Sequence, residues 1–228
     1  GYSNEAVSEL VIGTTLSLAR NLRSVEDRCR EGKDKTGLVG WEIKGKTVGI
    51  IGLGKIGTRT AELFHAFGAN VLAQSRTHHD GVAEYIEQVS QEELLRRSDI
   101  VVLHCPLNDS TRGMINAEKL AMMKPTALLV NVARGPVVVE KDLAAALENG
   151  VIAAAGLDVF CPEPPASDNP LLKLKNVIVL PHSGAGTSEC LEKSSQMAVG
   201  NIVEFFFGEN GKTMKTILNP EYRTGRRG

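Results

Sequence analysis

Residues 46–77 read KTVGIIGLGKIGTRTAELFHAFGANVLAQSRT and specify a strand, a turn, a helix and a second strand. The apolar run Thr47–Ile51 predicts the first strand, and Asn70–Gln74 predicts the second. Between them, the spacing of apolar residues over 55–67 predicts a helix that Gly68 ends. The turn GLGKIG at 52–57 fits the pattern G-x-G-x-x-G in the structural context which that pattern requires. The unit therefore predicts a dinucleotide-binding fold.

Each glycine of this turn has a separate expected role. Gly52 permits the tight turn, Gly54 lets a pyrophosphate approach the backbone, and Gly57 lets the helix and the strand pack closely. The amides at the start of the helix, together with the helix dipole, attract phosphate. The alternative is a glycine-rich turn that only packs and binds nothing.

The rest of the chain continues the alternation of strands and helices. Further helices are predicted at 4–18, with Asn4 as the cap, and at 90–97, 116–123, 140–148 and 187–207; further strands are predicted at 100–103, 127–132, 153–159 and 177–180. Residues 31–46 and 161–170 are predicted to be connections. Short uninterrupted apolar strands that alternate with helices indicate an α/β fold, in which a doubly wound parallel sheet of Rossmann type is covered on both faces.

The end of the second strand bears on the choice of dinucleotide. An acid at this point accepts hydrogen bonds from the adenosine ribose, but this chain has Ser75 and Arg76 there. A hydroxyl and a guanidinium suit the 2′-phosphate of NADP. The alternative is a surface arginine on a protein that uses NAD. The adjacent residues His78, His79 and Asp80 are predicted to form a solvated loop rather than a metal site.

Three residues that follow predicted strands form a candidate catalytic set. Arg134, Glu163 and His182 each come after the carboxyl end of a strand, where open α/β sheets place their sites. A histidine can give a proton to a ketone oxygen that accepts a hydride, and a carboxylate beside it would hold its tautomer. An arginine can pair with a substrate carboxylate. Taken singly, each residue could equally be a surface or structural residue.

Composition excludes several classes of protein. The chain has 228 residues, 42% of them apolar, and a net charge of −1, which argues against a nucleic-acid partner. The longest apolar runs are too short to span a bilayer and no leader opens the chain, so a cytoplasmic protein is expected. The spacing of the four cysteines fits no zinc pattern and predicts reduced thiols. Because Gly1 rather than Met comes first, the chain is expected to be a processed or partial product.

Five blocks carry a resemblance to the D-isomer-specific 2-hydroxyacid dehydrogenases: GKTVGIIGLGKIG, VVLHCPLNDSTRGMIN, LLVNVARGPVVVE, GLDVFCPEPP and LPHSGAGT. The resemblance extends over about residues 4–207. It implies that Arg134, Glu163 and His182 are catalytic. It also implies cofactor contacts at Gly52, Gly54, Gly57, Lys55 and Ile56 by the pyrophosphate, Ser75 and Arg76 by the ribose, Pro106 and Thr111 on the adenosine side, Val132 and Asp158 near the nicotinamide, and further at His104, Ala133 and Gly184.

The resemblance implies a homodimeric oxidoreductase that transfers a hydride between NAD(P)H and a small 2-keto acid, as glyoxylate and hydroxypyruvate reductases do. Members that use NAD usually carry Asp where Ser75 stands, which favours NADP here. Members also begin with a domain-sized segment, so residues 1–186 are expected to be the dinucleotide-binding domain and 187–228 to return to a substrate domain. The alternatives are a corepressor-like scaffold of the same fold, and an isolated module that binds the dinucleotide without turnover.

Overall fold

The computed structural model describes residues 3–77 and 79–207. The expected tail at 208–228 and His78 of the predicted loop lie outside these residues. Contacts between residues divide the chain after Gly184 into two units. The first unit contains the sheet and its helices. The described part of the second contains α7 (Ser188–Phe207).

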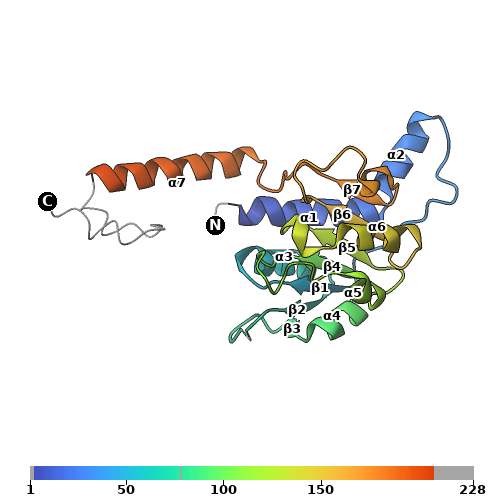
Figure 1. Cartoon of the computed structure of the whole chain (residues 1–228), viewed down its shortest axis with the longest axis horizontal. Helices are drawn as coiled ribbons and strands as arrows, with labels where there is room; N and C mark the ends of the chain where they lie inside the picture. The colour runs from blue at the N-terminus through green and yellow to red at the C-terminus, as the bar shows by residue number, and fades with distance from the viewer. Residues whose placement is uncertain (1–2, 78, 208–228) are drawn as a thin grey trace. The chain divides into compact units, whose positions relative to one another are not determined.

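A seven-stranded parallel sheet forms the centre of the first unit, and its order is β3-β2-β1-β4-β5-β6-β7. Figure 1 shows the strands following one another in this order from β3 to β7. The strands are β1 (Thr47–Ile51), β2 (Asn70–Gln74), β3 (Ile86–Gln88), β4 (Ile100–Leu103), β5 (Leu128–Asn131), β6 (Ala154–Leu157) and β7 (Val177–Val179). The first six strands have the order of the Rossmann fold, so the predicted fold class is confirmed.

Helices cover both faces of this sheet. The remaining elements are α1 (Asn4–Ala19), α2 (Leu22–Arg30), α3 (Lys55–Ala66), α4 (Gln91–Arg97), α5 (Ala117–Ala121), α6 (Glu140–Glu148) and the short 3-10 helices η1 (Gly135–Val137) and η2 (Pro170–Lys173). Side chains of α1 and α3 pack in one apolar cluster, and side chains of α4, α5 and α6 pack in the other. No helix among the described residues is long and apolar enough to cross a bilayer.

Strand β4 shows how the sheet separates the two clusters. Ile100 and Val102 belong to the cluster of α1 and α3, whereas Val101 and Leu103 belong to the cluster of α4 to α6. Successive side chains of a strand point to opposite faces, so a strand covered on both sides is apolar throughout. All four side chains are fully buried, and burial stabilises the fold by about 1.5–3 kcal/mol for each such side chain.

Several local details differ from the sequence prediction. Helix α2 was not predicted; it is short and rich in charged residues, and none of its residues is buried. Strand β3 was not predicted either, since it has only three residues. Asn4 is the first helical residue of α1 rather than its cap, which is Ser3. The expected cap at Ser90 is confirmed, because its hydroxyl oxygen accepts a hydrogen bond of 3.2 Å from the Glu93 amide.

Candidate active site

A cavity of about 550 Å³ lies at the carboxyl ends of β1, β2 and β4. Strands β1 and β4 are neighbours in the sheet although β2 and β3 come between them in the chain, so the strand order reverses here. Open α/β sheets bind ligands at such a reversal. The cavity is lined by Ile51, Gly52, Leu53, Gly54, Gln74, Ser75, Arg76, Thr77, His79, Gln91, His104, Cys105, Pro106, Asn108, Ser110, Thr111 and Met114.

The glycine turn borders this cavity, and its geometry fits a pyrophosphate. A Cβ atom on Gly52 would lie 2.6 Å from the Cys105 nitrogen, and its φ of 105° also favours glycine. A Cβ atom on Gly57 would lie 2.1 Å from the Gly52 carbonyl oxygen. A Cβ atom on Gly54 would meet no atom within 4 Å, so this position opens onto space that a ligand can occupy. Helix α3 begins directly after Gly54, and its first amides have no partner within the helix.

The rim of the cavity beyond β2 is formed by Ser75, Arg76, Thr77 and His79. The Ser75 hydroxyl donates a hydrogen bond of 2.6 Å to the Thr77 carbonyl oxygen and so closes the first turn of the loop. Among the described residues that line the cavity, none carries a carboxylate. The permanent positive charge of Arg76 is therefore not neutralised by an acid in the cavity lining.

His104 lines the cavity at the end of β4 and joins a buried chain of hydrogen bonds. Its Nε2 lies 3.0 Å from the Thr60 hydroxyl, which donates to the Ser8 hydroxyl over 3.2 Å. The Ser8 hydroxyl in turn donates to the Ile56 carbonyl oxygen over 3.3 Å. Since Thr60 uses its only proton on Ser8, His104 must donate from Nε2, and a neutral ring then leaves Nδ1 as an acceptor. Burial lowers the pKa of His104 to about 4, so the ring is neutral at pH 7.

We expect His104 to make the folded chain less stable in mild acid. The pKa of His104 is about 4 in the folded state against an ordinary 6.5, so the unfolded chain binds more protons between these values. Stability should be complete above pH 6.5 and decline as the pH falls toward 4, by at most about 3 kcal/mol. His104→Gln should flatten this decline in urea unfolding at pH 7.5 and 4.5. His65→Gln, on an exposed residue of α3, is the control, and equal declines in His104→Gln and the parent would contradict the assignment.

Glu163 and His182 form a hydrogen-bonded pair. The distance from His182 Nδ1 to Glu163 Oε2 is 2.8 Å, and the side chains are 50% and 37% exposed. Glu163 Oε1 also accepts a hydrogen bond of 3.1 Å from the Phe160 amide. Partial burial alone would raise the pKa of Glu163, but the hydrogen bonds from His182 and Phe160, with the charges of His182 and Arg134, hold it below its ordinary value. An ionised Glu163 accepts the proton on Nδ1, which leaves Nε2 of His182 for proton transfer.

A buried carboxylate fixes the loop that carries His182. Asp158 follows β6 and is 2% exposed. Its Oδ1 accepts hydrogen bonds from the Ser183 amide (2.7 Å) and hydroxyl (3.1 Å), and its Oδ2 accepts one from the Gly184 amide (2.8 Å). The His182 amide donates to the Asp158 carbonyl oxygen over 2.8 Å, and His182 has a φ of 55°, which non-glycine residues rarely adopt. The structure thus gives Asp158 and Gly184 a part in orienting His182; their contact with a dinucleotide stays a prediction.

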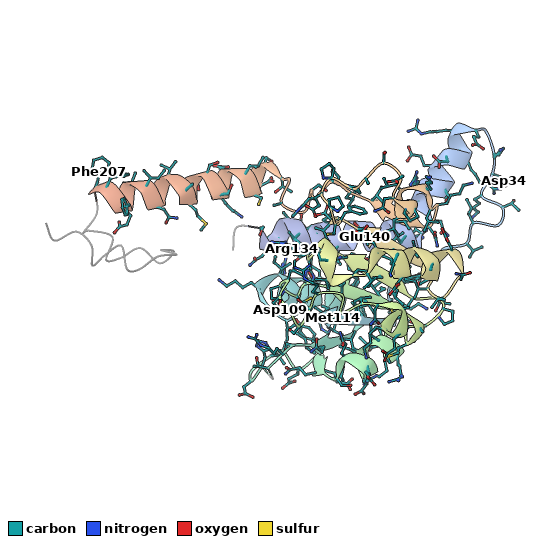
Figure 2. All side chains as sticks on the ribbon, viewed as in Figure 1. Asp34, Asp109, Met114, Arg134, Glu140 and Phe207 are labelled. Atoms are coloured by element: carbon teal, nitrogen blue, oxygen red, sulfur yellow. The ribbon has the colours of Figure 1, made fainter. Side chains whose placement is uncertain are left out.

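Arg134 follows β5, and backbone contacts connect it to the loop of Glu163. The buried Asn131 side chain accepts from the Ala133 amide (3.0 Å) and donates to the Arg134 carbonyl oxygen (3.1 Å). Gly135 lies so close to Phe160 that a Cβ atom on it would be 2.0 Å from the Phe160 carbonyl oxygen. Figure 2 labels Arg134, which is exposed, and Glu140 at the start of α6. The charge of Arg134 is near enough to lower the pKa of Glu163.

The predicted site residues fall into two groups within the first unit. One group lies at the cavity, and the other, which contains Arg134, Glu163 and His182, lies outside the cavity lining. Gly52, Gly54, Ser75, Arg76, His104, Pro106 and Thr111 line the cavity, and Lys55, Ile56 and Gly57 form the first turn of α3 beside it. Val132 and Ala133 lie between β5 and Arg134, outside the cavity lining.

Two residues that support the site were not predicted as such. Glu140 accepts hydrogen bonds from the Cys161 amide (2.6 Å) and the Asn169 side chain (2.7 Å), at either end of the segment that carries Glu163. The other is Asn131, whose side chain bonds to the backbone of Ala133 and Arg134. Neither position has a local sequence signal for this role.

Comparison with known proteins gives consistent matches. Residues 12–184 match the family model of the D-isomer specific 2-hydroxyacid dehydrogenase, NAD binding domain. A glyoxylate reductase of Aeropyrum pernix is 38% identical over 97% of this chain and 68% of its own length. The structure of D-lactate dehydrogenase from Aquifex aeolicus, complexed with NAD and lactic acid, matches with a TM-score of 0.86 and 32% identity over 94% of this chain and 70% of that one.

A second solved structure, an acyclic imino acid reductase in complex with NADPH and D-Arg, matches with a TM-score of 0.84 and 33% identity over 90% of this chain and 66% of that one. The chain spans from 44% to 69% of the length of eight curated relatives that it matches. The resemblance found in the sequence is therefore confirmed at the level of the family.

Proposed function

Because this chain belongs to the D-isomer specific 2-hydroxyacid dehydrogenase family, we propose that its protein transfers a hydride between a nicotinamide dinucleotide and a small 2-keto acid or D-2-hydroxy acid. The observation that carries the proposal is the hydrogen bond between Glu163 and His182, near Arg134 and in the same unit as the dinucleotide cavity. The A. pernix relative, a glyoxylate reductase, supports a small 2-keto acid as the substrate class.

Each residue of the set has a role in this reaction. The dinucleotide, when bound, supplies or accepts the hydride. His182 gives a proton to the carbonyl oxygen from Nε2, and Glu163 stabilises the protonated ring that precedes the transfer. Arg134 pairs with the substrate carboxylate and polarises the carbonyl. Gly54 and the first turn of α3 hold the pyrophosphate.

The proposal is tested by following oxidation of NADPH and NADH with glyoxylate, hydroxypyruvate and pyruvate in turn. Turnover with at least one of these acids is expected. Tight dinucleotide binding without turnover of any 2-keto acid would instead favour the scaffold function that the sequence left open.

We propose NADP as the preferred dinucleotide. Its 2′-phosphate carries negative charge, which an acid at the end of β2 would repel, whereas Arg76 lines the cavity there and no described lining residue is an acid. The neighbouring structures include one with NAD and one with NADPH, so both dinucleotides occur on this fold.

Arg76→Ala should weaken NADPH binding by about 1–3 kcal/mol, because it removes a charge-assisted hydrogen bond, and should leave NADH binding nearly unchanged. Fluorescence titration with both dinucleotides measures the two effects. Arg20→Ala, on an exposed arginine that does not line the cavity, is the matched control. An equal loss for NADPH and NADH would argue against the assignment.

We further propose that the protein is a homodimer. Helix α2 has no buried residue; its first residue, Leu22, is 50% exposed, and the apolar Val39 is 87% exposed. A second copy would remove this apolar surface from water. Light scattering of the purified protein tests the assembly.

A further inference from the structure

A pair of hydrogen bonds fixes a residue in the middle of the loop between β2 and β3. Gln88 Oε1 accepts from the His79 amide over 2.9 Å, and Gln88 Nε2 donates to the His79 carbonyl oxygen over 2.8 Å. One side-chain amide thus satisfies both backbone groups of a single residue. His79 lines the dinucleotide cavity, whereas Gln88 does not.

The sheet determines where Gln88 lies. It is the last residue of β3 and pairs with Ala73 of β2, one residue before the end of that strand. The next amide, that of Val89, donates to the Ala73 carbonyl oxygen over 3.0 Å. Gln88 therefore holds His79 to the sheet near the point where β2 ends and the loop begins.

The start of the same loop is also fixed. Ser75 follows β2 directly, and its hydroxyl bonds to the Thr77 carbonyl oxygen. Arg76 lies between these two fixed points, and its guanidinium is the proposed partner of the 2′-phosphate. An arginine side chain has many rotamers, so the cost of ordering it depends on how well its backbone is held before the ligand binds.

We propose that Gln88 is a positioning residue that sets the preference for NADPH over NADH by holding the loop of Arg76 and His79 in place. The inference rests on the proposed use of NADP. Only NADPH carries the 2′-phosphate, so a loosened loop weakens NADPH binding, whereas both dinucleotides share the pyrophosphate site at Gly54 and α3. The effect of Gln88 is therefore on the ratio of the two affinities.

The test compares Gln88→Met with the parent in the full-length protein. Methionine has nearly the same length and keeps the apolar contacts of the side chain, but it forms neither hydrogen bond. The KM for NADPH should rise by about tenfold, and the KM for NADH should change by less than about twofold. The kcat with each dinucleotide should be unchanged. Gln196→Met, on the exposed face of α7, is the matched control and should leave the ratio unchanged.

Three outcomes separate the alternatives. If the parent prefers NADPH and Gln88→Met keeps the same ratio of affinities, Gln88 does not position the loop and the inference is wrong. If both dinucleotides weaken equally, Gln88 has only a structural role, and the inference is again wrong. If the parent itself does not prefer NADPH, the proposed use of NADP fails, and the inference fails with it. A second variant, Gln88→Ala, lacks both the amide and the thioether. It should change the ratio of affinities in the same direction, which would show that the thioether is not the cause.

Discussion

His182→Ala should lower kcat for the reduction of glyoxylate or hydroxypyruvate by roughly 10²–10⁴-fold, which is the usual contribution of a positioned general acid. The imidazole is the only titratable ring that the structure places in a hydrogen bond with Glu163, among the residues described. Alanine removes the proton donor without touching the cavity, since His182 does not line it. The Kd for the dinucleotide should therefore change by less than about twofold.

Rapid mixing with saturating NADPH measures the chemical step, and fluorescence titration measures binding. The control is His65→Ala, because His65 stacks on Tyr85 beside a hollow at the opposite, amino-terminal end of the strands. A His182→Ala protein with parental kcat would show that the proton comes from another group. A variant that loses dinucleotide binding as well would show that the loop of His182 serves the cofactor site.

Gly54→Ala should weaken dinucleotide binding by on the order of 100-fold and leave the fold intact. A Cβ atom here meets no protein atom within 4 Å, and the φ of −86° suits alanine, so the thermal midpoint of the free protein should hold. The same methyl group occupies the space in which the pyrophosphate approaches the backbone. Isothermal titration with NADPH and NADH should show equal losses, because both carry the pyrophosphate.

Substitutions at two other glycines serve as comparisons for Gly54→Ala. Gly13→Ala adds a methyl group to α1 that also meets no atom within 4 Å, and it should alter neither binding nor folding adversely. Gly57→Ala would place its Cβ 2.1 Å from the Gly52 carbonyl oxygen, so this variant should lower the thermal midpoint of the free protein. Unchanged affinity in Gly54→Ala would mean that the ligand does not approach the turn as proposed.

The strand, turn and helix around Gly54 could be predicted because their signals are local. The glycine spacing and the apolar runs that flank it occupy adjacent positions in the chain, so one stretch of sequence contains both the motif and its context. The parallel, doubly wound sheet could be predicted from the same alternation of strands and helices. Helix α2 was missed, because its nine residues are mostly polar or charged.

The contacts that hold the candidate catalytic residues could not be read from the sequence. Asp158 binds the Ser183 amide, which is 25 residues away, and Glu140 binds the Cys161 amide, which is 21 residues away. These bonds depend on which strand ends meet at one edge of the sheet. Gln88 and His79 are closer in sequence, but their pairing required β3, which has only three residues and was missed. Single residues with plausible chemistry were predictable, whereas their partners required the tertiary structure.

The contact between Gly135 and Phe160 also has a consequence for protein engineering. Position 135 tolerates no side chain because the backbone of Phe160 already occupies the space, so libraries that aim at new substrates should keep this glycine fixed. Arg134 is exposed and has no such steric limit, but its proposed pairing with the substrate carboxylate is a chemical reason to keep it as well. Any change at position 135 would need a matching shift in the segment of Glu163. Recombination between relatives should for the same reason exchange residues 134–163 as a single block.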